Sequence, residues 1–400
     1  MNCMRKVGLA ILLVALTFVY ASEIMADEFK LIPSLAVRGE YNDNIFYTAD
    51  NEEDDYITTI SAGLELINRT ERFDLGLSAT VSPFYYADYS DLDEVDQNYR
   101  GTVGYKISPL LGVNANALYD VSNRRDRDIE TTGEVLTNDE RKRQKYGLGF
   151  DYTLTEKAAM GLSFDYLQDK WDDENLDRQD LEDYGAGLNF TYNLSKWWDS
   201  TISRLNFGVR RYKYELLDIE TSDTYYYSGT IGAQHWFSET VNLIVDLGAN
   251  YTDSDFLNPL LVEENNTYFG GTGQAILEKR GEITRGSIRI AHGFRPSSGS
   301  GTTVERSDVV LNLRRRFAER SVISISAGYY KNKADRGDFS FREIDEDTFF
   351  VRPSIRWEFF EDFTLEAGYD YVYEDDRVDN EDRKRSRVYL EVAYGLPLFE

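Results

Sequence analysis

Side chains that could act as a general base are scarce in this chain. The only two histidines are His235 and His292, and both fall on the apolar register of segments in which apolar and polar residues alternate. A serine nucleophile would need such a base beside it, and the sequence has no GxSxG, HExxH or glycine-rich phosphate motif. We predict that the protein is not an enzyme and that both histidines lie at a membrane interface. A membrane hydrolase is the less favoured alternative.

Charged side chains could instead steer or bind an ionic solute. The last third of the chain carries six arginines on the polar register, which we call the arginine wall: Arg285, Arg289, Arg314, Arg316, Arg352 and Arg356. The first half carries five carboxylates on the same register, which we call the acidic arc: Glu65, Asp74, Asp120, Asp151 and Asp165. Opposed walls of unlike charge would set a transverse field that favours polar, ionic or sugar-like solutes. The alternative is that these charges pair across the interior and hold it rigid.

Acidic runs offer oxygen ligands of the kind that Ca²⁺ prefers. They are DNEEDD at 50–55, the carboxylates between Asp88 and Asp96, and the stretch from Asp172 to Glu182. None has the glycine and terminal glutamate spacing of an EF-hand loop. We therefore expect a solvated acidic rim, with divalent ions bridging it to lipopolysaccharide, and we predict neither a bound metal nor another cofactor.

The elements that would position these charges have a period of two residues. In the first, Leu35, Val37 and Tyr41 share one face, while Arg38 and Glu40 share the other. Similar alternation recurs at 59–66, 146–153, 158–168 and 388–398. One face is apolar with aromatics near its ends, and the other carries Gly, Ser, Asn, Thr and charges. This pattern is typical of a strand with lipid on one side and water on the other.

Short and long connections alternate between these segments. The short ones are at 68–71, 108–112, 155–157, 195–201, 238–240, 279–282, 318–320 and 360–362. The long, acidic ones are at 42–55, 87–96, 123–143, 169–182, 215–224, 253–266, 295–305, 331–346 and 375–386. Nine long loops, each joining a hairpin, predict about 18 strands. The predicted fold is all-β, a transmembrane antiparallel up-and-down β-barrel with short periplasmic turns and long acidic extracellular loops, rather than a soluble sandwich.

The N-terminus has the features of an export signal. Two basic residues precede an apolar run at 7–19, and small residues up to Ala26 offer a cleavage site. We predict a signal peptide at 1–26 and one barrel domain at 27–400, located in the outer membrane of a Gram-negative bacterium; a retained helical anchor is the alternative. The net charge of −27 argues against nucleic acid as a partner, because phosphate binding needs basic patches.

A motif at the end of the first segment reads RGEYNDNIF, from Arg38 to Phe46. Together with the barrel pattern and the acidic loops, it resembles the family of outer-membrane barrels called putative β-barrel porin 2. The resemblance covers most of the chain after the signal, and it implies a barrel of a kind often associated with exopolysaccharide export. Within the motif we expect residues 42–44 to form a left-handed turn out of the membrane and residues 45–46 to lie against the rim.

These patterns and the resemblance lead to one expected function and one alternative. We expect passive passage of a hydrophilic solute through the outer membrane, and the resemblance implies a saccharide or an exopolysaccharide during export. The alternative is a non-conducting surface barrel, an adhesin or assembly scaffold that acts through its loops. Expected partners are outer-membrane lipid and lipopolysaccharide, the barrel assembly machinery and, through the resemblance, components of polysaccharide export.

Overall fold

The computed structural model describes residues 28–123, 140–171, 178–217, 219–258, 260, 262–297, 301–338 and 343–398. The predicted signal peptide lies outside these residues, which form 18 strands and one short 3₁₀ helix, η1 (Ser90–Leu92). The strands of the first half are β1 (Glu28–Asn42), β2 (Asp55–Arg69), β3 (Phe73–Tyr86), β4 (Glu94–Ser108), β5 (Leu111–Ser122), β6 (Arg141–Thr155), β7 (Ala158–Trp171), β8 (Asp180–Asn193) and β9 (Thr201–Leu216). Those of the second half are β10 (Ile219–Ser238), β11 (Val241–Leu257), β12 (Glu263–Arg280), β13 (Thr284–Ser297), β14 (Thr302–Ala318), β15 (Ser321–Ala334), β16 (Ile344–Phe360), β17 (Phe363–Asp376) and β18 (Glu381–Gly395).

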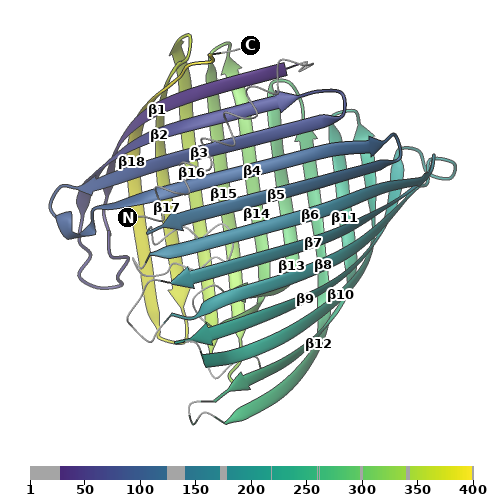
Figure 1. The fold of residues 1–400 in the computed structure, drawn as a ribbon. Coiled ribbons are helices and arrows are strands. Elements are labelled where there is room, and N and C mark those ends of the chain that lie inside the picture. The colour runs from purple at the N-terminus through teal and green to yellow at the C-terminus, as the bar shows by residue number, and fades with distance from the viewer. Residues whose placement is uncertain are drawn as a thin grey trace, which may run out of the picture.

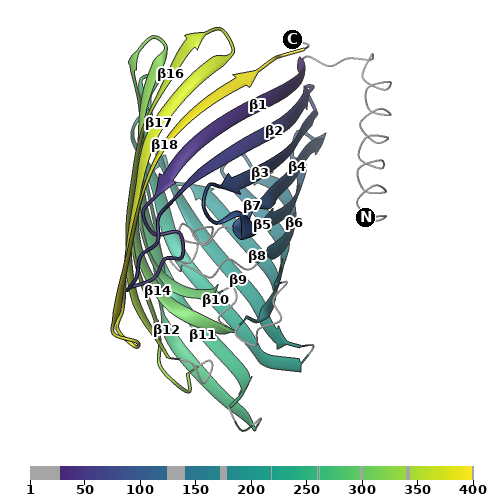
Figure 2. The same cartoon turned by 90° about the vertical axis from the view of Figure 1, so that its left-hand side faces the viewer.

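The strands form one closed antiparallel sheet (Figures 1 and 2). Each strand pairs with the next in sequence, and β1 also pairs with β18, from Ser34↔Gly395 to Asn42↔Arg387. The pairing of β1 with β18 joins the two ends of the sheet, which is favourable in hydrocarbon because unpaired backbone groups are costly there. The predicted 18-strand antiparallel barrel is confirmed. We call the end with turns such as 156–157 the short-turn end, and the opposite end the long-loop end.

The strands present an apolar outer face and a polar lumen face. Leu148 and Phe164, which pair across β6 and β7, point outward and are 40% and 45% exposed, as expected for side chains that lipid would cover. Aromatic rings also meet on this face: Tyr166 lies 6.4 Å from Tyr146 and 5.0 Å from Tyr184 between ring centroids. Within the described ranges no helix is long and apolar enough to cross a membrane.

Several connections at the long-loop end are shorter than the sequence predicts. The loop predicted at 215–224 is wrong, because β9 runs to Leu216 and pairs there with Ile219, the first residue of β10. Similarly, β17 and β18 are joined by 377–380 rather than by 375–386. These hairpins continue as paired strands beyond the apolar band. Both of their faces are polar there, so the period of two disappears from the sequence although the strands go on.

The loop that follows β1 folds into the lumen. Its Tyr47 is 5% exposed and packs with Tyr330 and Phe350 on the inner face of β15 and β16. Its Phe46 meets Tyr89, in the β3–β4 connection, edge-on at 5.2 Å between ring centroids. The motif expected to lie against the rim therefore reaches inward and narrows the long-loop end.

The backbone of this motif differs from the prediction. The prediction of a left-handed turn at 42–44 is wrong. In the loop after β1, the residues with positive φ are instead Tyr47, at 49°, and Asn51, at 54°. Asn44 has a different role, since its Nδ2 donates a hydrogen bond of 2.9 Å to the carbonyl oxygen of Lys384 in β18. This amide ties the loop to the strand that closes the barrel.

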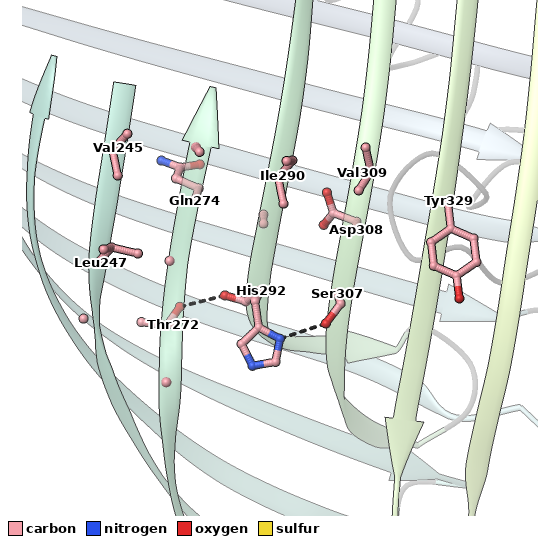
Figure 3. Close-up of a pocket in the computed structure, with 15 residues that line it drawn as sticks. Val245, Leu247, Thr272, Gln274, Ile290, His292, Ser307, Asp308, Val309 and Tyr329 are labelled. Atoms are coloured by element: carbon pink, nitrogen blue, oxygen red, sulfur yellow. Dashed lines mark hydrogen bonds between the residues drawn. The ribbon is translucent and has the colours of Figure 1, made fainter. Parts of the chain in front are cut away.

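The barrel wall is interrupted between β12 and β13. Their pairing runs from Arg280↔Arg285 at the short-turn end only as far as Gly273↔His292. Beyond that point β12 continues on β11, while β13 bends away with β14, as Figure 3 shows. We call this divergence the split.

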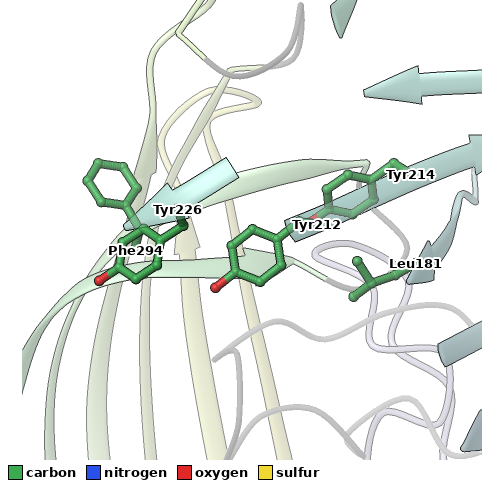
Figure 4. Packing of buried hydrophobic residues seen from close by; sticks show 5 residues of the cluster. All are labelled: Leu181, Tyr212, Tyr214, Tyr226 and Phe294. Atoms are coloured by element: carbon green, nitrogen blue, oxygen red, sulfur yellow. The ribbon is translucent and has the colours of Figure 1, made fainter. Parts of the chain in front are cut away.

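Beyond the split, the end of the β13–β14 hairpin folds into the lumen. Phe294 packs against Tyr226 and Tyr268, at ring-centroid distances of 6.5 and 4.9 Å, on the inner face of β10 and β12. From β9, the Tyr214 hydroxyl donates a hydrogen bond of 2.6 Å to the carbonyl oxygen of Thr302. Figure 4 shows the aromatic side chains gathered here. The hairpin end thus narrows the lumen from a second side.

Candidate lumen site

Strand register sets all eleven residues of the arginine wall and the acidic arc on the lumen-facing side. On the arginine side the pairs that fix this are Arg285↔Arg314, Arg314↔Ser324, Arg316↔Val322, Val322↔Arg356, Ser326↔Arg352 and Arg289↔Val310. Paired residues share a face, so these arginines lie together on neighbouring strands. Most of them belong to the half of the barrel nearer the short turns, and Arg352 lies midway along β16.

Three of these arginines line one cavity of about 500 Å³ on the wall formed by β12 to β16. They are Arg285, Arg314 and Arg352, and the polar side chains between them include those of Ser287, Asn312, Ser324, Ser326 and Ser354. Small hydroxyl and amide side chains leave the guanidinium groups accessible. The result is a polar, cationic recess that opens on the lumen.

Two arginines of this recess have no acidic partner. Among the described residues, no carboxylate forms an ion pair with Arg285 or Arg314. Arg352 differs, because its Nε lies 3.0 Å from Oδ2 of Asp370, and the Asp370 carboxylate also accepts from Arg387. The recess therefore presents two guanidinium groups whose donors are available to a solute.

The rest of the arginine wall is paired with neighbouring strands, apart from Arg316, which forms no ion pair within the described part of the chain. Nη2 of Arg289 lies 2.8 Å from Asp308, which is 2% exposed at its side chain. Nη2 of Arg356 lies 2.6 Å from Glu366. Both carboxylates neutralise their arginines within the wall itself.

Carboxylates of the acidic arc are likewise satisfied along their own side of the barrel. Asp165 lies 2.6 Å from Arg210, Asp120 lies 3.7 Å from Arg141, and Asp74 lies 3.4 Å from Arg69. Asp151 accepts a hydrogen bond of 3.1 Å from Asn114, whereas Glu65 forms no ion pair with any described residue. Where the structure describes the chain, no ion pair joins the arc to the wall across the lumen.

Sequence reasoning missed the counter-charges on each side. Asp246 is 3% exposed and lies 3.1 Å from Arg204, and it also accepts from Gln274 at 3.0 Å. These residues stand on the same polar register as the predicted ones, so that register could have revealed them. Because each wall carries both signs, it sets up a weaker transverse field than a wall of one sign would. Within the recess, Arg285 and Arg314 keep their charge without an ion pair to any described residue.

Both histidines lie on the outward register, away from the lumen. Nδ1 of His235 is 2.9 Å from the Thr201 hydroxyl. Nδ1 of His292 is 2.9 Å from the Ser307 hydroxyl, and its Nε2 is 3.1 Å from Glu305. Each ring is thus held by polar partners on its own or a neighbouring hairpin. Among the described residues, no three metal-ligating side chains are grouped so that they could hold an ion.

Comparison with protein families confirms the predicted resemblance. The model of the family described as "Putative beta-barrel porin 2" matches residues 23–144. No curated protein matches the chain. With its porin-like sequence signature and closed antiparallel sheet, the chain is a porin-like barrel of the outer-membrane type.

Three solved structures of similar fold are distant in sequence. The ferric citrate transporter FecA in its unliganded form is 9% identical, with a TM-score of 0.49, over 88% of this chain and 60% of that one. OccK2 (OpdF) of Pseudomonas aeruginosa is 10% identical, with a TM-score of 0.47, over 94% and 99%. OccAB4 of Acinetobacter baumannii is 11% identical, with a TM-score of 0.45, over 93% and 99%. The chain therefore spans 60% of the FecA structure and nearly all of the other two.

Proposed function

We propose that this porin-like barrel is an outer-membrane channel for hydrophilic solutes, and that its solute is a saccharide, or an exopolysaccharide during export, that carries negative charge. The observation that carries the proposal is the recess with Arg285 and Arg314. A guanidinium group binds a carboxylate or sulfate through two parallel hydrogen bonds. The serine and asparagine side chains around it suit the hydroxyl groups of a sugar. The acidic rim would repel an anionic polymer, and the recess supplies the opposite charge inside.

The narrowed long-loop end supports selective passage rather than a wide pore. Tyr47 on one side and the β13–β14 hairpin on the other reduce the free cross-section. A scaffold with a braced lumen would be expected to neutralise its interior charges. The unpaired arginines of the recess favour the channel over that alternative.

Two measurements test the channel. Purified barrel in planar bilayers should conduct, and proteoliposomes should swell faster in glucuronate than in glucose. A folded barrel that neither conducts nor admits either solute would overturn the channel, whereas equal rates for the two solutes would overturn the preference for negative charge.

We also propose that the short-turn end faces the periplasm, because outer-membrane barrels have this asymmetry of connections. Epitope tags inserted at 335–343 or 377–380 should bind antibody on intact cells. Tags at 156–157 or 239–240 should bind only after permeabilisation. The reverse pattern would invert the orientation.

One observation favours a second candidate, a hydrolase of membrane lipids. His292 bridges Ser307 and Glu305, which is the connectivity of a nucleophile, base and acid. Polar side chains at a membrane surface need such partners in any case, and a hydrolase needs oxyanion donors as well, so we rank this candidate second. Purified barrel in phospholipid micelles should release no fatty acid. Release that a Ser307→Ala variant abolishes would establish the hydrolase instead.

A further inference from the structure

The split opens the barrel wall over part of its height. β11 and β12 pair along the whole of their length, down to Leu257↔Glu263. By contrast, β12 and β13 stop pairing at Gly273↔His292, and the last residues of β13 pair only with β14. Between Gly273 and the long-loop end, β12 and β13 are therefore not paired with each other.

Polar side chains donate hydrogen bonds to backbone carbonyl oxygens at the edge of the split. The Thr272 hydroxyl donates a hydrogen bond of 3.2 Å to the carbonyl oxygen of His292, the last ladder residue of β13 (Figure 3). The Asn250 amide donates one of 3.1 Å to the carbonyl oxygen of Gly271. Gly271 has no partner on β13, and an unpaired carbonyl is costly in hydrocarbon, so the contact from Asn250 stabilises the backbone there without a partner strand. The opening is a built feature of the wall.

The edge of the split lies within the apolar band. Outward positions on β12 run from Leu277 through Gly273 and Gly271 to Phe269, which pairs with Tyr251 on β11. Phe269 is 74% exposed and lies four residues beyond Gly273, or about 13 Å along the strand. The split therefore starts at the level of lipid acyl chains and not only in the loops.

Two cavities meet at this edge. An apolar groove of about 620 Å³ on the outer face is lined by Leu247, Ile290, Val309 and Tyr329, among others. A second cavity, of about 350 Å³, lies on the lumen side between the inner face of β9 to β12 and the folded-in end of β13. Five residues line both cavities: Thr272, Gly273, Gln274, Ala291 and His292. These shared residues lie between the groove and the lumen-side cavity.

Charge on the lumen side indicates what the site would hold. The inner cavity is lined by Arg204, Arg210 and Arg295. Arg204 pairs with Asp246 and Arg210 with Asp165, but Arg295 forms no ion pair with any described residue. A negatively charged head group is the complement of that free guanidinium group, and an acyl chain is the complement of the groove.

We infer that the split is a lateral site for an amphiphile with an acyl chain and an anionic head group. The chain lies in the outer groove, and the head group reaches through the split to Arg295 in the lumen-side cavity. This site is separate from the recess proposed for the hydrophilic solute.

Photo-crosslinking tests this inference with palmitate that carries a diazirine on its chain, using the full-length barrel in detergent. Labelled peptides should come from β11 to β15, the strands whose residues line the groove. Gly271 faces the groove, and a Cβ there would meet nothing within 4 Å, so Gly271→Phe should fill the groove and reduce labelling about tenfold or more. Gly39→Phe is the matched control, because Gly39 also faces outward, from β1, and has the same free space.

A second variant separates head-group binding from folding. Arg295→Ser should weaken labelling by palmitate several-fold and leave labelling by the neutral glycerol monoester of the same acid unchanged. Labelling spread evenly over all strands, or unchanged in both Gly271→Phe and Arg295→Ser, would overturn the inference. Conductance should be the same in Gly271→Phe as in the wild type. Conductance therefore tests the channel, and labelling tests the amphiphile site, so either proposal can fail without the other.

Discussion

Removing the two unpaired arginines of the recess should change ion selectivity without unfolding the barrel. In the double variant Arg285→Ser, Arg314→Ser, no described carboxylate loses a partner, so stability should stay near that of the wild type. A cavity of about 500 Å³ places an anion roughly 8 Å from each guanidinium group. Coulomb's law in water then gives about 0.5 kcal/mol per arginine, or about 1 kcal/mol for both. That corresponds to about a fivefold loss of local anion concentration.

Reversal potentials in a KCl gradient across planar bilayers measure this change. The double variant should shift towards cation selectivity, and the shift should shrink in about 1 M salt, where the screening length falls to about 3 Å. Arg315→Ser is the matched control, because Arg315 follows Arg314 on β14 but points outward, paired with Ile323. A conducting, folded double variant with an unchanged reversal potential would refute the placement of these charges in the ion path. So would an equal shift in Arg315→Ser.

Three further tests concern the register, the paired arginines and the inward loop. Phe164→Arg should cost about 2–4 kcal/mol near mid-membrane and Ser163→Arg much less, as read from folding titrations; equal losses would mean the faces are misassigned. Arg352→Ser should lower the free energy of unfolding by about 2–3 kcal/mol, because Asp370 is nearly buried and loses one of its two arginines; no loss would show that this pair contributes nothing. Replacing 45–52 by two glycines should raise single-channel conductance, and an unchanged conductance would place the constriction elsewhere.

The barrel could be predicted from the sequence because each strand has one apolar face, which gives a period of two residues. Leu148 and Phe164 belong to different segments, yet each segment shows the same period, and the connection at 155–157 shows that they are neighbours. The positions of the strand ends could not be predicted in this way. Beyond the apolar band, residues such as 220–224 are polar on both faces, so nothing in the pattern separates an extended hairpin from a loop.

The site could be predicted only in part. The alternation along a strand shows which residues share a face, but it does not show which residues of neighbouring strands are paired. The sequence assigns Arg289 to the lumen side of its strand, but it does not reveal that the register of β13 and β14 brings Asp308 next to it. The split had no periodic signal either. Its traces are three glycines, Gly270, Gly271 and Gly273, and glycine in a strand has several possible meanings.

The seam between β1 and β18 has a consequence for biogenesis. Nε of Arg38 lies 2.8 Å from Glu391, a residue 353 positions later in the chain. One edge of β1 pairs with β2, but its other edge has no partner until the last strand, β18, has been synthesised, exported and inserted. Until then the incomplete sheet has two edges with unpaired backbone N–H and C=O groups, which are costly in hydrocarbon. A chain truncated before β18 should accumulate in the periplasm as substrate for chaperones and proteases, even though most of its strands are intact.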